Sequence, residues 1–150
     1  MPKAHPLRGK PALLHSKFFP PLQGAAGKMS SSDDNSAIFL TDSPEQIAEK
    51  IKTHAFSGGR ESSKLQRELG ADLEKDVSYQ WLRFFLEDDD ELERIGAEYG
   101  SGTGEYWATS GVKKRLIELL QEMVGEHQRR RAAISDAEVL AWMAVRPLEF

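Results

Sequence analysis

The sequence contains no cysteine, which excludes disulfide bonds and thiolate metal sites and suits a protein of the cytosol. No apolar run approaches the roughly 18 residues that a membrane span needs, and the N-terminal stretch lacks the apolar core of a signal peptide. The few histidines are far apart and never four residues from one another, so we expect no bound metal; they are His5, His15, His54 and His127.

Several motifs of nucleotide and ion chemistry are also missing. The acidic run from Glu87 to Glu91 lacks the alternating spacing of a calcium loop, and we interpret it as the solvent-exposed N-terminal end of a helix. Neither a Walker phosphate loop nor a Gly-x-Ser-x-Gly elbow occurs. These absences remove the commonest classes of calcium-binding, P-loop and hydrolase protein.

The composition predicts one folded domain, and the charge is unevenly distributed, with a basic N-terminal segment. The chain has 150 residues, 39% of them hydrophobic, which is enough for one domain with a packed core. Its net charge of −4 hides an asymmetry, because residues 1–32 carry no acid and all of the following basic residues: Lys3, Arg8, Lys10, Lys17 and Lys28. This pattern predicts either a local anion site or a solvated tail whose charge has no role.

Residues 41–150 have the apolar periodicity of about five helices packed as a bundle. The first begins with the capping box Ser43–Gln46, buries the stripe Ile47, Ile51 and Ala55, and is expected to end at Gly58 and Gly59. After a polar stretch with room for one short helix, Asp76 is expected to cap a helix from Val77, and the acidic run caps the next. The longest helix is expected over residues 112–133, and a last one, capped by Ser135 and Glu138, stops near Pro147.

The first 40 residues are different. Five of the seven prolines lie there, which forbids a long helix, and Ala37–Leu40 reads as a short buried strand. The stretch also holds apolar residues that need a surface to lie against: Leu13, Leu14, Phe18, Phe19 and Leu22.

The stretch "GKMSSS" raises the question of phosphate chemistry. A lysine on a loop of glycine and serine can approach a polyphosphate closely, because small residues leave backbone N–H groups and hydroxyls free to donate. By itself this pattern is also that of an ordinary polar loop.

The surrounding stretches favour the first reading. They occur in one order: "KPALLHSKFFPPLQG", "GKMSSSDDNSAIFLTD", "IKTHAFSGGRE", "DVSYQWLRFFLEDDDELE" and "GVKKRLIELLQEMVGEHQRRR". Over residues 9–148 the chain closely resembles the C-terminal portion of tryptophanyl-tRNA synthetases of the eukaryotic and archaeal type. The resemblance implies a mainly α fold, in which residues 1–40 are a strand-and-loop remnant of a class I Rossmann catalytic domain. Residues 41–150 would form the helical anticodon-binding bundle.

The resemblance also implies a site for ATP. "KMSSS" stands where the family has its Lys-Met-Ser-Lys-Ser loop, so Lys28 takes the place of the catalytic lysine that stabilises the ATP phosphates. Met29 takes the place near the adenine, and Ser30 and Ser32 match. Ser31 stands where many class I enzymes have a second lysine. The family uses ATP and Mg²⁺, acts in the cytoplasm and is usually homodimeric.

A second implied site reads tRNA. Arg60 stands where the family has an arginine that contacts anticodon bases, and Glu61 stands where an aspartate is often found. The Glu61 carboxylate can accept from the amino group of cytosine, which the tryptophan anticodon offers. Lys113 resembles a basic tRNA-contacting position, although it is equally typical of a solvated lysine.

Two departures limit the expectation. The loop 100–111 is a few residues longer than is usual in the family, and the His-x-Gly-His signature of class I enzymes is absent from the sequence. We therefore expect a fragment of a tryptophan–tRNA ligase that is inactive alone. The alternatives are a free-standing tRNA-binding module without catalysis and a helical protein-interaction module.

Overall fold

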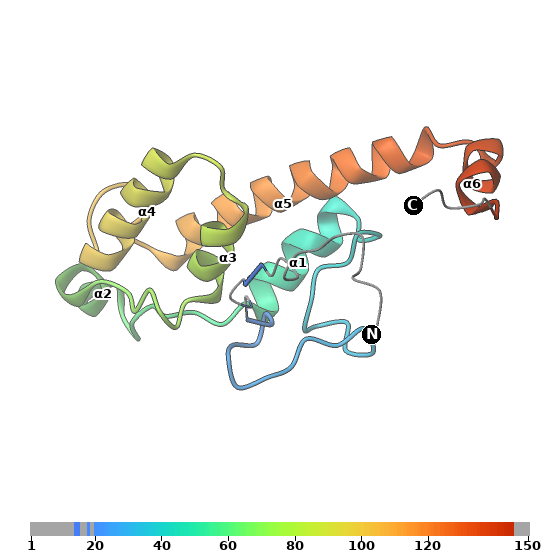
Figure 1. The fold of residues 1–150 in the computed structure, drawn as a ribbon. Coiled ribbons are helices and arrows are strands. Elements are labelled where there is room, and N and C mark those ends of the chain that lie inside the picture. The colour runs from blue at the N-terminus through green and yellow to red at the C-terminus, as the bar shows by residue number, and fades with distance from the viewer. Residues whose placement is uncertain (1–13, 16–17, 19, 146–150) are drawn as a thin grey trace, which may run out of the picture.

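The structure, a computed structural model, describes residues 14–15, 18 and 20–145, and Figure 1 shows their arrangement. The mainly helical expectation is confirmed. The described residues form six helices: α1 (Pro44–His54), α2 (Ser63–Leu69), α3 (Val77–Phe85), α4 (Asp89–Ser101), α5 (Thr109–Ala132) and α6 (Asp136–Met143). The expected starts of most of them are confirmed by side-chain caps, namely Ser43, Asp76, Asp88 and Ser135.

Helix α5 is the spine of the bundle. Its 24 residues span about 36 Å, and it packs against α1, α3 and α4, while α2 packs against α4 (Figure 1). It begins three residues earlier than expected, because the apolar stripe starts only at Val112, one turn inside the helix.

The core lies where these helices meet. It is formed by apolar side chains from α1, α3, α4 and α5 and from the segments between them, including Ile47, Ile51, Trp81, Leu82, Ile95, Tyr99, Val112, Leu116 and Leu120. Each fully buried side chain of this size stabilises the fold by about 1.5–3 kcal/mol.

The segment before α1 is fastened to the bundle without forming a strand. Leu22 is fully buried in the helical core, and the indole N–H of Trp81 donates to the carbonyl oxygen of Pro20 at 2.7 Å. The expectation of a strand at Ala37–Leu40 is wrong: the described residues contain no strand. With no neighbouring strand to pair with, the amide of Phe39 donates instead to Asp42 Oδ2 at 2.8 Å.

The expected end of the first helix is also wrong. Helix α1 ends at His54, and the chain leaves it in an extended conformation at Ala55. The Phe56 amide then donates to the Leu22 carbonyl at 2.7 Å, and the Val77 amide donates to the Phe56 carbonyl at 3.1 Å. Gly58 is needed for a different reason, because a Cβ there would lie 2.1 Å from the carbonyl oxygen of Asp72.

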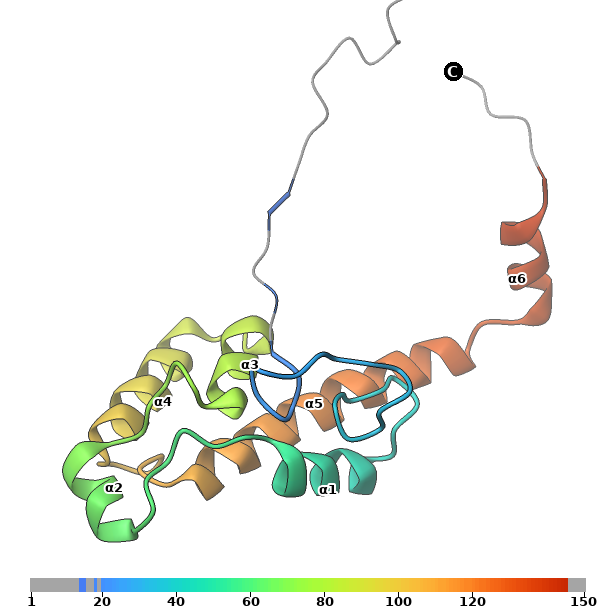
Figure 2. The same cartoon turned by 90° about the horizontal axis from the view of Figure 1, so that it is seen from below.

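Helix α6 projects from the end of α5, away from the bundle (Figure 2). It has no buried residue, and its apolar residues Trp142 and Met143 are 76% and 78% exposed. Leu14 and Phe18 of the N-terminal apolar stretch are also fully exposed. None of the helices described is long and apolar enough to cross a membrane. Some of the expectations concern residues that lie outside the described part of the chain: Lys3, His5, Arg8, Lys10, Leu13, Lys17, Phe19 and Pro147.

The close approach at Gly58 predicts the effect of adding one methyl group. Gly58→Ala should destabilise the fold by at least about 2 kcal/mol in urea unfolding, since the methyl meets backbone that cannot move aside. Gly125→Ala is the matched control, because the nearest atom to its Cβ is the mobile Arg129 Nη1 at 3.6 Å. We expect it to stabilise α5 by about 0.5–1 kcal/mol. Equal stability of Gly58→Ala and the wild type would contradict this packing.

Candidate functional site

The loop that carries Lys28 is a set of turns closed by a buried serine. The Ser36 hydroxyl donates to the carbonyl oxygens of Ser30 and Asp33 at 3.1 and 2.8 Å, and it accepts from the Ser30 amide at 3.0 Å. The Ser30 and Ser32 hydroxyls lie 2.8 Å apart. Gly24, with φ of 100°, opens the turn that precedes them. The loop is therefore held by its own polar side chains.

Lys28 is exposed on this loop and makes no hydrogen bond or ion pair with any residue that the structure describes. Met29, beside it, is half-buried and packs against the helical core. It lines an apolar cavity of about 250 Å³ together with Ile38, Trp81 and Phe85, among others. The loop thus offers a free ammonium group next to an anchored methionine.

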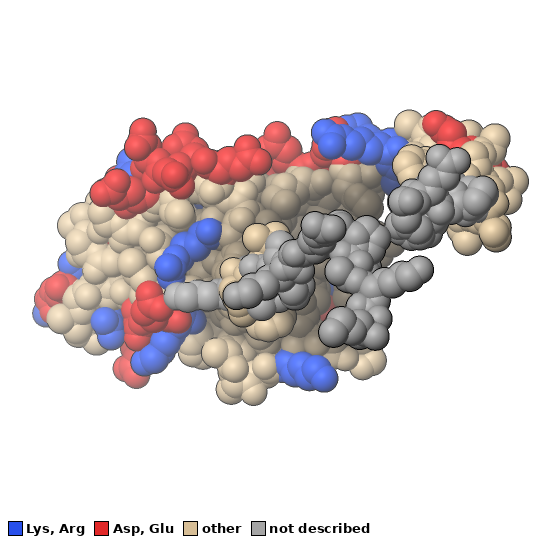
Figure 3. Space-filling model, viewed as in Figure 1, with Lys and Arg blue, Asp and Glu red and all other residues tan. Residues whose placement is uncertain are grey.

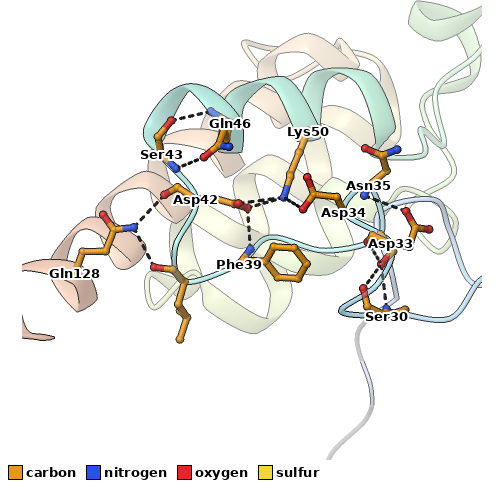
Figure 4. A network of polar contacts seen from close by, with 12 residues as sticks. Ser30, Asp33, Asp34, Asn35, Phe39, Asp42, Ser43, Gln46, Lys50 and Gln128 are labelled. Carbon is orange, nitrogen blue, oxygen red and sulfur yellow. Dashed lines mark hydrogen bonds and ion pairs between the residues drawn. The ribbon is translucent and has the colours of Figure 1, made fainter.

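A buried lysine joins this loop to α1, as Figure 4 shows. Lys50 Nζ donates to Asp42 Oδ2 at 2.9 Å and to Asp34 Oδ1 at 3.2 Å, and it lies 4.4 Å from the centre of the Phe39 ring. Desolvation lowers the pKa of Lys50, but hydrogen bonds and charges from the two aspartates outweigh it and raise the pKa overall. Gln128 of α5 donates to the carbonyl oxygens of Leu40 and Asp42, both at 3.0 Å, which fixes the end of the segment.

A second polar centre fixes the segment 57–60. Asp76 is fully buried, and its Oδ2 accepts from the Gly58 amide at 2.9 Å and from the Tyr99 hydroxyl at 2.8 Å. The Tyr99 hydroxyl also lies 2.8 Å from Thr109 Oγ1, which is 3.0 Å from Ser57 Oγ. The Asp76 carboxylate therefore ties this segment to α3 and α4, and the hydroxyls of Tyr99 and Ser57 tie it to Thr109, the first residue of α5.

Arg60 and Glu61 follow this fixed segment and are both exposed. The Arg60 amide donates to Gln66 Oε1 at 2.9 Å, and Arg60 Nε donates to the Gly70 carbonyl at 2.7 Å. The two remaining guanidinium nitrogens have no partner among the described residues. Arg60 lines a pocket of about 190 Å³ together with Gln66, Trp107, Thr109 and Ser110, among others.

Lys113 lies one turn along α5 from that pocket. Its Nζ donates to the carbonyl oxygen of Lys52 in the last turn of α1 at 3.0 Å, so it is half-buried and not a plain solvated lysine. Desolvation lowers its pKa, opposed by the charge of Asp76. It lines a groove of about 660 Å³ with Lys52, Lys114 and others.

The structure therefore groups the expected residues into two places. The Arg60 pocket and the Lys113 groove are adjacent, because both are lined by Thr109 and Ser110. The loop of Lys28 lies elsewhere, across the middle of α5, while α2 stands at the opposite end of the bundle (Figure 2). The sequence did not predict a role for Lys50, and it predicted Asp76 only as a helix cap. The signal available for Lys50 was its position, as a lysine, on the apolar stripe of α1.

Acidic and basic side chains gather at different places on the surface. Acidic side chains gather along the edge formed by α4 and the loop before it, and basic ones gather at the end of α5 (Figure 3). A polyanion is repelled by such an acidic edge.

The comparisons with known proteins show the family of the chain. The family of class I tRNA synthetases (W and Y) matches residues 4–131. The chain belongs to this family. The cytoplasmic tryptophan–tRNA ligase of Arabidopsis thaliana is 58% identical over 139 residues, which are 93% of this chain and 34% of that protein. The human cytoplasmic enzyme is 52% identical over 141 residues, covering 94% and 29% of the two chains.

Solved structures show the same relationship. The tryptophanyl-tRNA synthetase of Giardia lamblia superposes with a TM-score of 0.80 at 45% identity, covering 87% of this chain and 31% of that one. The enzyme of the archaeon Aeropyrum pernix gives 0.73 at 33% identity, covering 89% and 34%. This class I synthetase chain thus spans about a third of the length of the relatives that it matches.

The Asp76–Tyr99 contact predicts a stability change. Burial, and then the charge of Asp76, raises the pKa of Tyr99 above its ordinary value of 10.0. The folded chain therefore holds this proton more tightly than the unfolded chain, so the contribution to stability is complete below pH 10 and is lost as the pH rises further. Tyr99→Phe should cost about 2 kcal/mol in urea unfolding at pH 7, because a buried carboxylate loses a donor.

The same variant should also lose less stability than the wild type between pH 10 and 11. Tyr106, whose pKa is also raised by burial and by the charge of Glu91, contributes an alkaline decline in stability that is common to both proteins. Parallel curves of unfolding free energy against pH would contradict the role given to Tyr99.

Proposed function

We propose that this chain is the C-terminal part of a tryptophan–tRNA ligase, which joins tryptophan to its tRNA through tryptophanyl-adenylate. The observation that carries the proposal is the 58% identity with a named tryptophan–tRNA ligase over 93% of the chain. In this proposal residues 1–40 end the catalytic domain, and residues 41–150 are the anticodon-binding domain. The names of the relatives favour this over a separate RNA-binding or interaction module and place the enzyme in the cytoplasm.

Lys28 supplies the positive charge in the proposed activation step. The tryptophan carboxylate attacks the α-phosphorus of ATP, and pyrophosphate leaves as negative charge builds on the phosphate oxygens. An ammonium group on an exposed loop, with no competing carboxylate partner among the described residues, can stabilise that charge. Ser31 adds an exposed hydroxyl in place of a second lysine.

The residues present fit ATP better than they fit a metal held by the protein alone. Lys28 and the hydroxyl of Ser31 are the donors available to the phosphates, whereas the nearby carboxylate of Asp34 is already paired with Lys50. Mg²⁺ would neutralise phosphate charge when ATP is bound. The complete enzyme is proposed to act as a homodimer on tryptophan, ATP and tRNA(Trp).

Arg60, Glu61 and Lys113 are the proposed contacts to tRNA. The free guanidinium nitrogens of Arg60 and the exposed carboxylate of Glu61 can hydrogen-bond to the edges of bases that are splayed out of the loop. The groove of Lys113, with Lys52 and Lys114, follows the pocket of Arg60 and suits the neighbouring phosphates.

The purified 150-residue chain should not form adenylate, because Lys28 alone lacks the groups that position ATP and tryptophan. We expect tryptophan-dependent exchange of pyrophosphate into ATP at the background rate. The Lys28→Ala variant gives that background, and exchange above it by the wild-type chain would refute the expectation.

Arg60→Ala should weaken binding to the anticodon hairpin of tRNA(Trp) on the order of tenfold and relax the preference for its anticodon. Fluorescence anisotropy with that hairpin and with one of altered triplet measures both effects. Arg83→Ala is the matched control, since Arg83 is an exposed arginine of α3 outside the pocket. Wild-type binding that ignores the triplet would remove the support for anticodon recognition.

A further inference from the structure

Trp107 lies in the loop between α4 and α5 and lines the same pocket as Arg60. The guanidinium carbon of Arg67, from α2, lies 3.8 Å from the centre of the Trp107 ring. A guanidinium group at this distance is attracted by the face of the ring. We call these two side chains the Arg67–Trp107 pair.

The backbone of this loop is held independently of the indole. The Glu98 carboxylate accepts from the amides of Glu105 and Tyr106 at 2.7 and 2.9 Å, and the Tyr106 ring is buried. Trp107 contributes its carbonyl oxygen, which accepts from Gln66 Nε2 at 3.0 Å. The indole is therefore presented by a fixed loop and is not needed to build it.

Gln66 connects the pair to Arg60. Its side chain is buried, and it accepts from the Arg60 amide while it donates to the Trp107 carbonyl. The positions of Arg60 and Trp107 are thus set by one amide group. Any ligand that contacts Arg60 in this pocket meets Trp107 at its wall.

Both side chains of the pair have hydrogen-bond donors that lack an acceptor in the described part of the chain. Arg67 is exposed and makes no hydrogen bond or ion pair there, and the Trp107 N–H has no acceptor there. None of the described residues that line the pocket is acidic. A flat cation on an aromatic ring, with unused donors and beside a pocket whose described lining contains no acidic residue, is complementary to a planar base that carries a phosphate.

We propose that the Arg67–Trp107 pair is a stacking platform for an unpaired RNA base next to the one contacted by Arg60. The base stacks on the pair, and the free guanidinium donors bind its phosphate. This rests on the proposed recognition of the anticodon loop and adds a contact that holds the loop without reading its sequence, since every base has a flat face.

The test uses the 150-residue chain and the anticodon hairpin of tRNA(Trp), with binding measured by fluorescence anisotropy. Trp107→Ala should weaken binding on the order of tenfold, whether or not the triplet is altered, while Trp107→Phe binds nearly as well as the wild type. Arg67→Lys keeps the charge but loses the flat group, so it should bind more weakly than the wild type. Lys64→Ala, an exposed cation on the same helix, is the matched control and should have no effect.

A second measurement separates lost stacking from a disturbed fold. Each unpaired nucleotide outside the triplet is replaced in turn by an abasic one, and the variants are measured again. At one position the abasic replacement should weaken binding to the wild type but not to Trp107→Ala. Two results would overturn the platform. In one, the losses of affinity caused by the abasic nucleotide and by Trp107→Ala add at every position; in the other, Trp107→Ala binds the hairpin as tightly as the wild type.

These outcomes are distinct from failure of the proposed function. If wild type prefers the tryptophan anticodon and Arg60→Ala loses that preference, anticodon recognition stands whatever Trp107→Ala does. If wild type shows no preference for the triplet, anticodon recognition fails, while the loss in Trp107→Ala still reports whether the pair stacks on RNA.

Discussion

The buried carboxylate of Asp76 is the constraint on which the rest of the bundle depends. A carboxylate without partners in an apolar core costs several kcal/mol, so the fold must deliver donors to it. The donors are the amides of Gly58 and Tyr79 and the hydroxyl of Tyr99. Because they come from α3, α4 and the segment after α1, satisfying one side chain fixes the relative position of three parts of the chain.

The two proposed binding regions follow from this constraint and from a second one. The segment that ends in Arg60 is rigid because its glycines fit against Asp72 and Thr109, which leaves the Arg60 side chain exposed on a fixed base. The loop of Lys28 is held by the buried pair of Lys50 and Asp42 and by the turns around the buried Ser36. A rigid segment favours the proposed reading of bases, because hydrogen bonds to base edges need a defined geometry.

Sequence reasoning located the helices well, because their signals are local. Ser43 with Gln46 and Ser135 with Glu138 form their capping boxes, and the stripe of Ile47, Ile51 and Ala55 is buried as expected. The errors concern features whose cause is distant in the chain. Ala37–Leu40 has the composition of a strand but no strand to pair with among the described residues, and Gly58 is required by the backbone of Asp72.

The sequence alone therefore determined the helical bundle, its caps and the motifs that resemble a tryptophanyl-tRNA synthetase, since periodicity, capping and motif order are all written along the chain. Only the tertiary structure decided that Lys50 anchors the loop of Lys28, and that Arg60, Trp107 and Lys113 border adjoining pockets. The physical reason is that these contacts join residues far apart in sequence, whose approach depends on how α1, α2 and α5 pack around one core.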